Sequence, residues 1–594
     1  MIEIITTRQR RAMTVVSLFL GATIALFVMC DVCVAGMDAP EAVTASYVKP
    51  PVVGHNMMVV SANPIASKIG FQTLEKGGSA IDAAIAVQLA LGLVEPQSSG
   101  LGGGAFLLYY DAKKRALMAF DGRETAPAGV TPNLFIGADG KPMTFVDASV
   151  SGRSVGTPGV VRLLETIHRH AGRLPWKDVF QPAIQLAEQG FIISPRLAFL
   201  IANDQEALRR NANVRNYLFT PEGAPLQAGA HLANPAYAQT LRVLAENGPD
   251  AFYRGPIAAD IIRSVRSDPL YPGSLSENDL SEYRVKTVEP LCGPYRVYRI
   301  CSFPPPSSGG VAILQILGVL EPFALAPPNS TQAIHLIAEA SKLAFADRNH
   351  YVADPAFWPT PTLELIDRGY LMQQSKRIDP KHAAPTPVSP GSPPQRQGGL
   401  VAPDDSSELP STSHFIVVDR DGNIVSVTSS IENAFGSKIM TRGFFLNNQL
   451  TDFSFLPATS EGKPIANRIE PGKRPRSSMV PVIVFDKEQR PFMTVGSAGG
   501  PRIIGQVVLA LIGVLDWRLN IQEALNLPLF FNRNSDTELE EGTPLIDLKP
   551  SLEAMGHRVI ISRISSGTHG ITLGVNGGLV GGADVHREGL AIGD

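Results

Sequence analysis

The sequence predicts a large mixed α/β protein. Its 594 residues are too many for one ordinary small domain and enough to bury a sizeable core. Hydrophobic residues make up 44% of the chain and charged residues 18%, a composition typical of globular proteins and not of disordered ones. Helix and strand patterns both occur along the chain, and 54 Gly and 48 Pro indicate many turns and loops between them.

The charge balance excludes one class of partner. Lys and Arg total 52 against 55 Asp and Glu, which gives a formal net charge of -3. Such a chain offers no long-range attraction to a polyanion. We therefore expect no nucleic-acid partner.

The N-terminal segment predicts export. A basic stretch, Arg8–Arg11, precedes an apolar run over Met13–Met29, and small residues at 33–35 are typical of a signal-peptide cleavage site. We expect residues 1–36 to be an export signal and the mature protein to be periplasmic or secreted. The apolar run is also close to the length of a membrane span, so anchoring by an uncleaved segment stays open as the alternative.

Signal cleavage would leave two cysteines. Cys30 and Cys33 lie within the signal, and Cys292 and Cys301 remain. If Gly293-Pro294 forms the turn of a hairpin, the two remaining cysteines are not directly opposed on it. Two free, partly buried thiols are then at least as compatible with the sequence as a disulfide.

Residues 79–91 predict a buried helix. Ser79 is a suitable N-cap, and the many small apolar residues that follow permit close packing. Asp82, Gln88 and the nearby Pro96 argue against a membrane span.

The glycine-rich segment 100–104 precedes a predicted strand at 106–110. A dinucleotide-binding motif needs a strand, glycines and a helix in that order, and here the order is reversed. We interpret the glycines as a tight turn at a place where backbones approach closely.

A proline-rich segment leads directly into a predicted hairpin. We expect a flexible linker over 382–411, because residues 382–410 contain seven prolines and almost no large apolar residue. Two strands follow at 415–418 and 424–428, with a turn at 419–423 between them.

Thr412 lies at the junction of the linker and the hairpin. A peptide bond in such a place is well placed for cleavage. A threonine with a free α-amine carries a nucleophile and a base on one residue, so cleavage of the Ser411-Thr412 bond would create a catalytic group. On this local pattern alone, an ordinary Thr that opens a strand is the simpler interpretation.

Several motifs occur in order along the chain: Phe120–Glu124, Pro304–Gly310, Ala346–Arg348, Thr412–Phe415, Phe444–Gln449, Asp452–Phe453, Lys473–Met479, Gly496–Gly500 and Gly582–Arg587. Together they resemble the γ-glutamyltranspeptidase family of N-terminal nucleophile hydrolases over nearly the whole chain after the signal. The resemblance implies a four-layer αββα fold. It also implies self-cleavage between Ser411 and Thr412 into a large subunit, 37–411, and a small subunit, 412–594, which stay together as a heterodimer.

The resemblance assigns the chemical step to four residues. Thr412 would be the nucleophile in both self-cleavage and catalysis, and Ser430 would assist its amine. Gly499 and Gly500 would present backbone N–H groups to the oxyanion, although a plain Gly-Gly turn explains them equally well without the resemblance.

Substrate recognition falls to a second set. The guanidinium of Arg123 would bind the α-carboxylate of a glutamyl group, and Ser477 and Ser478 would donate hydrogen bonds to the same carboxylate. Asp452 would hold the substrate ammonium. Surface ion pairing for Arg123 and turn roles for the others are the structural alternatives.

Two features depart from the family pattern. Glu432 stands where many members have Asn, and its carboxylate still suits the ammonium, while Gln449 fits a polar wall of the site. The segment between Ser454 and Lys473 is short and has no Tyr, whereas many members carry a longer lid with an aromatic residue. An open site is implied.

The sequence thus predicts an exported enzyme that opens γ-glutamyl amides, with glutathione as the first substrate to test and water, amino acids or peptides as acceptors. No cofactor is implied, and no metal, because the His residues, His414 included, show no ligand spacing. One alternative is a related acylase acting on glutaryl or poly-γ-glutamyl amides. Another is a processed but inactive periplasmic binding protein.

Overall fold

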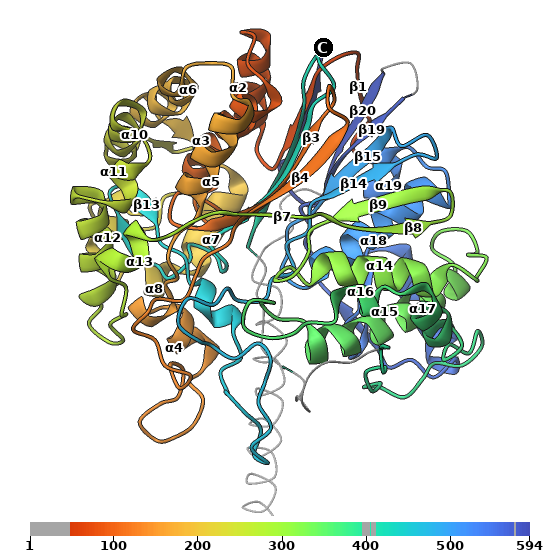
Figure 1. Ribbon diagram of the computed structural model, residues 1–594. Helices are drawn as coiled ribbons and strands as arrows, with labels where there is room; N and C mark the ends of the chain where they lie inside the picture. The colour runs from red at the N-terminus through yellow and green to blue at the C-terminus, as the bar shows by residue number, and fades with distance from the viewer. Residues whose placement is uncertain (1–47, 395–403, 405–410, 575–577) are drawn as a thin grey trace, which may run out of the picture. The chain divides into compact units, whose positions relative to one another are not determined.

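The computed structural model describes residues 48–394, 404, 411–574 and 578–594 (Figure 1). The predicted export signal and part of the predicted linker, 395–403 and 405–410, lie outside these residues. In the described ranges, no helix has both the length and the apolar character needed to cross a bilayer.

Two antiparallel sheets of seven strands form the centre of the protein. In spatial order, sheet I contains β21 (Leu590–Gly593), β2 (Met58–Ser61), β10 (Ser413–Val418), β11 (Ile424–Ser430), β3 (Gly104–Asp111), β4 (Ala116–Gly122) and β7 (Lys286–Val288). Sheet II contains β1 (Val52–Gly54), β20 (Leu579–Ala583), β19 (His569–Leu573), β15 (Pro491–Gly496), β14 (Val482–Phe485), β9 (Tyr298–Ser302) and β8 (Leu291–Tyr295).

Helices cover the outer face of each sheet (Figure 1). Over sheet I lie α2 (Pro64–Glu75), α3 (Ala80–Val94), α5 (Val160–Ala171), α6 (Trp176–Gln189) and α10 (Pro235–Asn247). Over sheet II lie α14 (Gly309–Leu320), α15 (Thr331–Tyr351), α17 (Arg368–Ser375), α18 (Arg502–Leu515) and α19 (Ile521–Leu525). A small sheet of β16 (Phe530–Asn532), β17 (Thr537–Glu540) and β18 (Val559–Ser562) adjoins α15.

The apolar side chains form three main layers of core. One cluster lies between the sheets and takes residues from both, including Ile416 of β10 and Ile483 of β14. The other two clusters fill the spaces between each sheet and its helices. Because each sheet is buried on both faces, the architecture is αββα, and the fold class implied by the resemblance is confirmed.

The predicted local elements are present. Helix α3 begins after Ser79, whose side chain forms a capping box with Asp82, and every residue of the helix is buried. The predicted hairpin is β10 and β11, which pair from Ser413 opposite Ser429 to Val418 opposite Ile424. These two strands occupy the middle of sheet I, so the chain around Thr412 is fixed by the core.

The glycine turn before β3 allows a close backbone approach, as predicted. A Cβ atom on Gly102 would lie 2.1 Å from the carbonyl oxygen of Phe445, and one on Gly103 would lie 2.1 Å from that of Ser430. Neither position tolerates a side chain, because both contacts are with backbone. The turn therefore lets the end of β11 lie directly against the start of β3.

The structure corrects the prediction for the cysteines. Cys292 and Cys301 form a disulfide and lie directly opposite each other on β8 and β9. The hairpin turns after Tyr295 and not at Gly293-Pro294, which are strand residues of β8. This shift of the turn brings the two cysteines into register.

The first part of the predicted linker is fastened to the body. Residues 382–394 are largely exposed, as expected, but their backbone makes specific hydrogen bonds. The amide of Val388 donates to Asn534 Oδ1, and that of Gly391 donates to Asp347 Oδ1, each over 2.7 Å. This stretch is therefore held in place despite its proline content.

Candidate active site

A pocket lies where several strands of both sheets end. Thr412 immediately precedes β10, Ser430 ends β11, and Arg123 follows β4, while Gly500 follows the end of β15. The pocket is lined by Arg123, Thr412, Ser430, Glu432, Gln449, Asp452, Ser477, Ser478, Met479, Gly500 and Ile503. Every predicted site residue except Gly499 and Ser411 therefore lines one pocket.

The hydroxyl of Ser430 organises the nucleophile end of the pocket. It donates to the carbonyl oxygen of Ser411 over 2.8 Å and accepts from the amide of Glu432 over 2.8 Å. It also accepts a hydrogen bond from Thr412 Oγ1 over 3.3 Å. Because a hydroxyl has one donor and two acceptor sites, these three partners use its full capacity. The threonine oxygen and the carbonyl that it would attack are thus joined through one side chain.

The backbone around Thr412 is held on both sides. Arg587 Nη1 donates to the carbonyl oxygen of Thr412 over 2.9 Å. The hydroxyl of Ser411 donates to the carbonyl oxygen of Gln97 over 2.7 Å. Both Ser411 and Thr412 are buried, so the Ser411-Thr412 bond lies in a fixed, enclosed geometry and not on a flexible loop.

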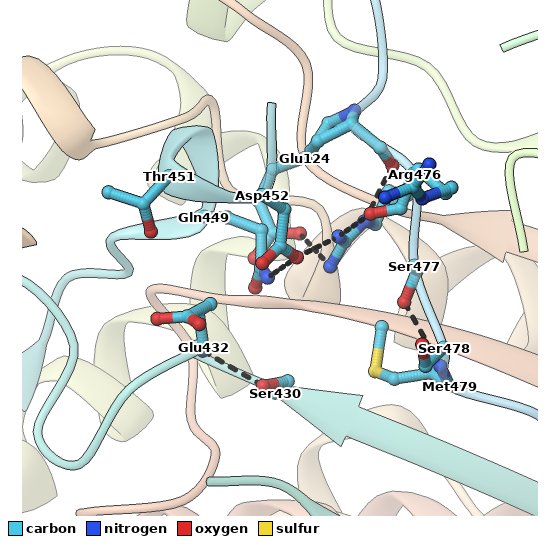
Figure 2. Close-up of polar contacts among 12 residues, drawn as sticks. Glu124, Ser430, Glu432, Gln449, Thr451, Asp452, Arg476, Ser477, Ser478 and Met479 are labelled. Carbon is cyan, nitrogen blue, oxygen red and sulfur yellow. Dashed lines mark hydrogen bonds and ion pairs between the residues drawn. The ribbon is translucent and has the colours of Figure 1, made fainter. Parts of the chain in front are cut away.

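The opposite end of the pocket is charged. Arg123 is completely buried, and its Nη2 atom lies 2.5 Å from Asp452 Oδ2. Gln449 Nε2 donates to the same carboxylate oxygen over 2.7 Å (Figure 2). The surface ion pair considered for Arg123 is therefore excluded, and the residues assigned to the substrate carboxylate and ammonium pair with each other.

Two motifs far apart in sequence position Arg123. Its Nη2 atom donates to the carbonyl oxygen of Arg476 over 3.0 Å, and its Nε atom donates to that of Pro475 over 3.3 Å. A buried ion pair at 2.9 Å joins Arg474 to Asp121, whose other carboxylate oxygen accepts from the amide of Arg123. The end of β4 and the 473–479 loop therefore fix one another.

The paired serines are held by the loop before α14. The amide and the hydroxyl of Ser308 both donate to the carbonyl oxygen of Ser477, over 2.7 and 2.8 Å. Arg348 Nη2 donates to Ser478 Oγ over 2.8 Å, and its Nε donates to Ser308 Oγ. The motif at 304–310 thus supports the two serines, and Arg348 of α15 orients the hydroxyl of Ser478.

Glu432 lies between the two ends of the pocket (Figure 2). Its backbone φ is +79°, a conformation that non-glycine residues adopt infrequently. Asn448 Nδ2 donates to its Oε2 over 2.5 Å. The hydrogen bond from the backbone amide of Glu432 to Ser430 Oγ and this side-chain contact hold the carboxylate at the pocket wall.

Gly499 and Gly500 have φ values of +138° and +60°. A side chain at either position would be strained, so glycine is required by the backbone itself. Their place at the end of β15 sets this turn beside Thr412, and Gly500 lines the pocket.

The sequence is similar to known proteins over most of its length. The family model for γ-glutamyltranspeptidase matches residues 66–594. A glutathione hydrolase proenzyme of Bacillus subtilis (strain 168) is 38% identical over 555 residues, which cover 91% of this chain and 92% of that protein. A glutathione hydrolase proenzyme of Escherichia coli (strain K12) is 36% identical over 567 residues, with 93% and 95% covered. The crystal structure of cephalosporin acylase from Bacillus halodurans superimposes with a TM-score of 0.80 at 27% identity and covers 92% of this chain and 98% of that one.

The chain belongs to the γ-glutamyltranspeptidase family. It is therefore an enzyme of the N-terminal nucleophile class, as the motifs predicted.

The short segment after Ser454 lies beside the pocket without lining it. The segment 454–473 is fully described, and none of its residues lines the pocket. Asn467 of this segment supports the pocket from outside, because its Nδ2 donates to the carbonyl oxygen of Asp452 over 2.7 Å and its Oδ1 accepts from the amide of Arg476 over 3.0 Å.

Three residues that contact the predicted site residues had no predicted role. Glu124, Arg348 and Arg587 lie in motifs that carried the resemblance, but no task was assigned to them. Glu124 is completely buried beside Arg123, and burial raises its pKa to about 8 against the opposing effect of the guanidinium. Met479 and Ile503 supply the apolar part of the lining. Glu124, Arg348 and Arg587 could have been found from the motifs in which they lie.

Proposed function

We propose that this enzyme cleaves its own Ser411-Thr412 bond and then uses Thr412 to open γ-glutamyl amides, with glutathione as the first substrate to test. The observation that carries the proposal is the hydroxyl of Ser430, which contacts both Thr412 Oγ1 and the carbonyl oxygen of Ser411. One side chain thus aligns the nucleophile and polarises the bond that it attacks.

The cleavage proceeds by an N-to-O shift. Thr412 Oγ attacks the carbonyl carbon of Ser411, the C–N bond breaks, and the proton of the hydroxyl passes to the leaving amine. The product is an ester between Ser411 and Thr412 Oγ. Water then hydrolyses this ester, which leaves a carboxylate on Ser411 and a free α-amine and hydroxyl on Thr412. Two chains result, ending at 411 and beginning at 412, and the interleaved sheets hold them together as a heterodimer.

Catalysis repeats the same chemistry on a substrate. The free α-amine accepts the proton of Thr412 Oγ as this oxygen attacks the γ-carbonyl carbon. The amides of Gly499 and Gly500 donate to the oxyanion, and the amine of the leaving group takes the proton. Water, an amino acid or a peptide then resolves the glutamyl ester.

The charged end of the pocket suits a zwitterion. A substrate α-carboxylate would replace Asp452 as the partner of Arg123, with support from Ser477 and Ser478. The substrate ammonium would then neutralise Asp452 and Glu432. A glutaryl group has no ammonium and would leave two buried carboxylates without a cation, which is costly. The pocket therefore favours glutamyl over glutaryl substrates.

An acylase activity is the second candidate. The likeness to a cephalosporin acylase favours it. Rates on γ-glutamyl and glutaryl p-nitroanilides, measured on one preparation, distinguish the two activities. Release of p-nitroaniline from neither compound by the cleaved protein would favour an inactive binding protein instead.

Export is part of the proposal. The sequence supports a signal over residues 1–36, and the disulfide between Cys292 and Cys301 is typical of an oxidising compartment such as the periplasm. We infer a periplasmic or secreted enzyme.

The decisive test is Thr412→Ala. We expect the wild type to give two bands on a denaturing gel, with the smaller band beginning at Thr412 by N-terminal sequencing. The variant should remain one chain and lose at least about 10⁴-fold in kcat/KM, because nucleophile and base are both removed. Thr412→Ser, which keeps a hydroxyl, is the matched control and should still cleave. Cleavage of the Ala variant at the same bond would overturn autocatalysis.

A further inference from the structure

A buried group of metal-binding side chains lies in the helical layer over sheet II, outside the active-site pocket. His335 and Glu339 are one turn apart on α15, and His557 follows α20 (Lys549–Ala554). One ligand atom from each residue lies within 4.8 Å of the others, and all three residues are buried. Imidazole nitrogens and a carboxylate oxygen are the ligands that Zn²⁺ takes in proteins.

The outer contacts of the two histidines orient them toward each other. His335 Nε2 lies 2.8 Å from the carbonyl oxygen of Asp379, which can only accept, so the proton of this imidazole is on Nε2. Its Nδ1 lone pair therefore faces His557 Nε2 over 2.8 Å. His557 Nδ1 in turn lies 3.0 Å from the hydroxyl of Thr537. Metal-bound histidines in proteins commonly make outer hydrogen bonds of this kind.

Glu339 completes the group. Its Oε2 accepts from the amide of Ala384 over 2.9 Å, which fixes the direction of the carboxylate. Its Oε1 lies 2.7 Å from Lys342 Nζ, and this ammonium also donates to the carbonyl oxygen of Ala384 over 3.0 Å. Each carboxylate oxygen has two lone pairs, so these contacts leave acceptor capacity for a cation.

We propose that His335, Glu339 and His557 bind one divalent transition-metal ion, with Zn²⁺ as the reference ion. Two nitrogens in a tetrahedral zinc site are roughly 3.3 Å apart, given Zn–N bonds of about 2.0–2.1 Å. The histidine nitrogens at 2.8 Å need to separate by only about half an ångström to reach this distance. The histidines need to lose no proton when the ion binds. His557 changes tautomer, so that its proton lies on Nδ1, which donates to Thr537, and its Nε2 is free to bind the ion. A fourth position is left for water.

The positions of the ligands in the chain give the ion a structural role. His335 and Glu339 precede the Ser411-Thr412 bond and His557 follows it, so a bound ion would join the two subunits after cleavage. This consequence rests on the proposed cleavage, but binding of the ion does not. The sequence predicts no metal site, because its His residues show no ligand spacing. The pair at 335 and 339 has helical spacing, but the third ligand is 222 residues from His335.

Lys342 provides a test that distinguishes a metal site from a purely structural cluster. Its ammonium competes with a metal ion for Glu339 and repels a second positive charge. Replacing it by Met keeps an unbranched side chain as far as Cε and removes the charge. Lys342→Met should therefore bind Zn²⁺ about tenfold more tightly, which corresponds to roughly 1.4 kcal/mol of relieved repulsion. A purely structural role for this cluster predicts no such gain.

Zn²⁺ binding is measured by equilibrium dialysis and elemental analysis on metal-stripped, full-length protein, both wild type and uncleaved Thr412→Ala. We expect one Zn²⁺ per chain in both, and loss of this ion in His335→Ala and His557→Gln. His382→Ala, which removes an exposed histidine, is the matched control and should retain the ion. At 100 times the Kd, Zn²⁺ should raise Tm by about 2 °C in the wild type and not in His557→Gln.

Two results would overturn the site. One is retention of stoichiometric Zn²⁺ by His557→Gln, and the other is equal loss in His382→Ala, which would indicate adventitious binding at the surface. If His335→Ala fails to fold, the gain in Lys342→Met still decides the question. Stoichiometric binding to a wild-type protein that remains one chain would support the metal site and contradict the proposed cleavage, so the two failures are distinguishable.

Discussion

The two ends of the active-site pocket work by different physical means. At one end, Thr412, Ser411 and Ser430 are neutral, and their roles are fixed by hydrogen-bond direction. At the other end, Arg123 and Asp452 carry opposite charges and neutralise each other. In the proposed function, the first end has its partners in place before any substrate arrives, whereas the second would exchange its partners to bind one.

In the proposed function, this difference separates the chemical step from substrate recognition. A buried hydroxyl with all its hydrogen bonds made costs little to maintain. Ser430 and Thr412 lie at the ends of two central strands, so the attack geometry is rigid. A buried ion pair is costly to form and strongly destabilised when one partner is lost, so it selects for a ligand that replaces both charges at once. Variants at the two ends should therefore fail in different ways.

After Thr412→Ala, Ser430→Ala should show the largest effect at the neutral end. It removes the donor to the carbonyl of Ser411 and the acceptor for Thr412 at the same time, while Ala keeps the strand. We expect self-cleavage to slow by roughly 10²–10³-fold, the usual effect of losing one donor to a developing oxyanion. The rate is followed by the appearance of two bands after expression at low temperature. Ser426→Ala, on the same strand, is the control, and an equal effect there would contradict the role of Ser430.

Asp452→Asn tests the charged end. The amide keeps the shape but leaves the substrate ammonium with a weaker partner, so kcat/KM for a γ-glutamyl anilide should fall by about 10²-fold, mostly through KM. A glutaryl anilide lacks the ammonium and should lose much less. The measured quantity is the ratio of the two kcat/KM values, with Asp547→Asn, at an exposed residue, as the control. An unchanged ratio would remove Asp452 from substrate recognition, and the amount of cleaved protein should stay as in the wild type.

Elements that depend on local sequence patterns could be predicted, whereas features that depend on distant contacts could not. The hairpin at 413–430 and the capped helix at 80–94 follow from local patterns, and their bounds shifted by only a few residues. The four layers came from the resemblance, because the antiparallel order of two seven-stranded sheets depends on contacts between distant segments. The hairpin of Cys292 and Cys301 was misread because the position of its turn was assigned from Gly-Pro alone.

The residues of the candidate site could be chosen from motifs, but their mutual contacts could not. Nothing in the sequence indicates that Arg123 pairs with Asp452 across 329 residues, or that Arg348 orients Ser478. The linker shows the same limit. Its composition predicts disorder, and the structure holds 382–394 through single hydrogen bonds to side chains on remote elements.

Glu124 allows a smaller and sharper test, because it lies beside the charged end without a hydrogen bond to either carboxylate oxygen among the described residues. Its pKa is raised by burial from the ordinary 4.5 to about 8. Between these two pH values the folded protein holds a proton that the unfolded chain has released, so this residue makes stability fall as pH rises through that window. Glu124→Gln removes the ionisation. The Tm of the variant relative to the wild type should therefore increase from pH 5 to pH 8, by about 2–4 °C in total. Glu488→Gln, an exposed substitution, should show no such trend. The informative quantity is the slope of this Tm difference with pH. A difference that does not change with pH would reflect only the packing of the amide, and would mean that Glu124 is already ionised beside Arg123.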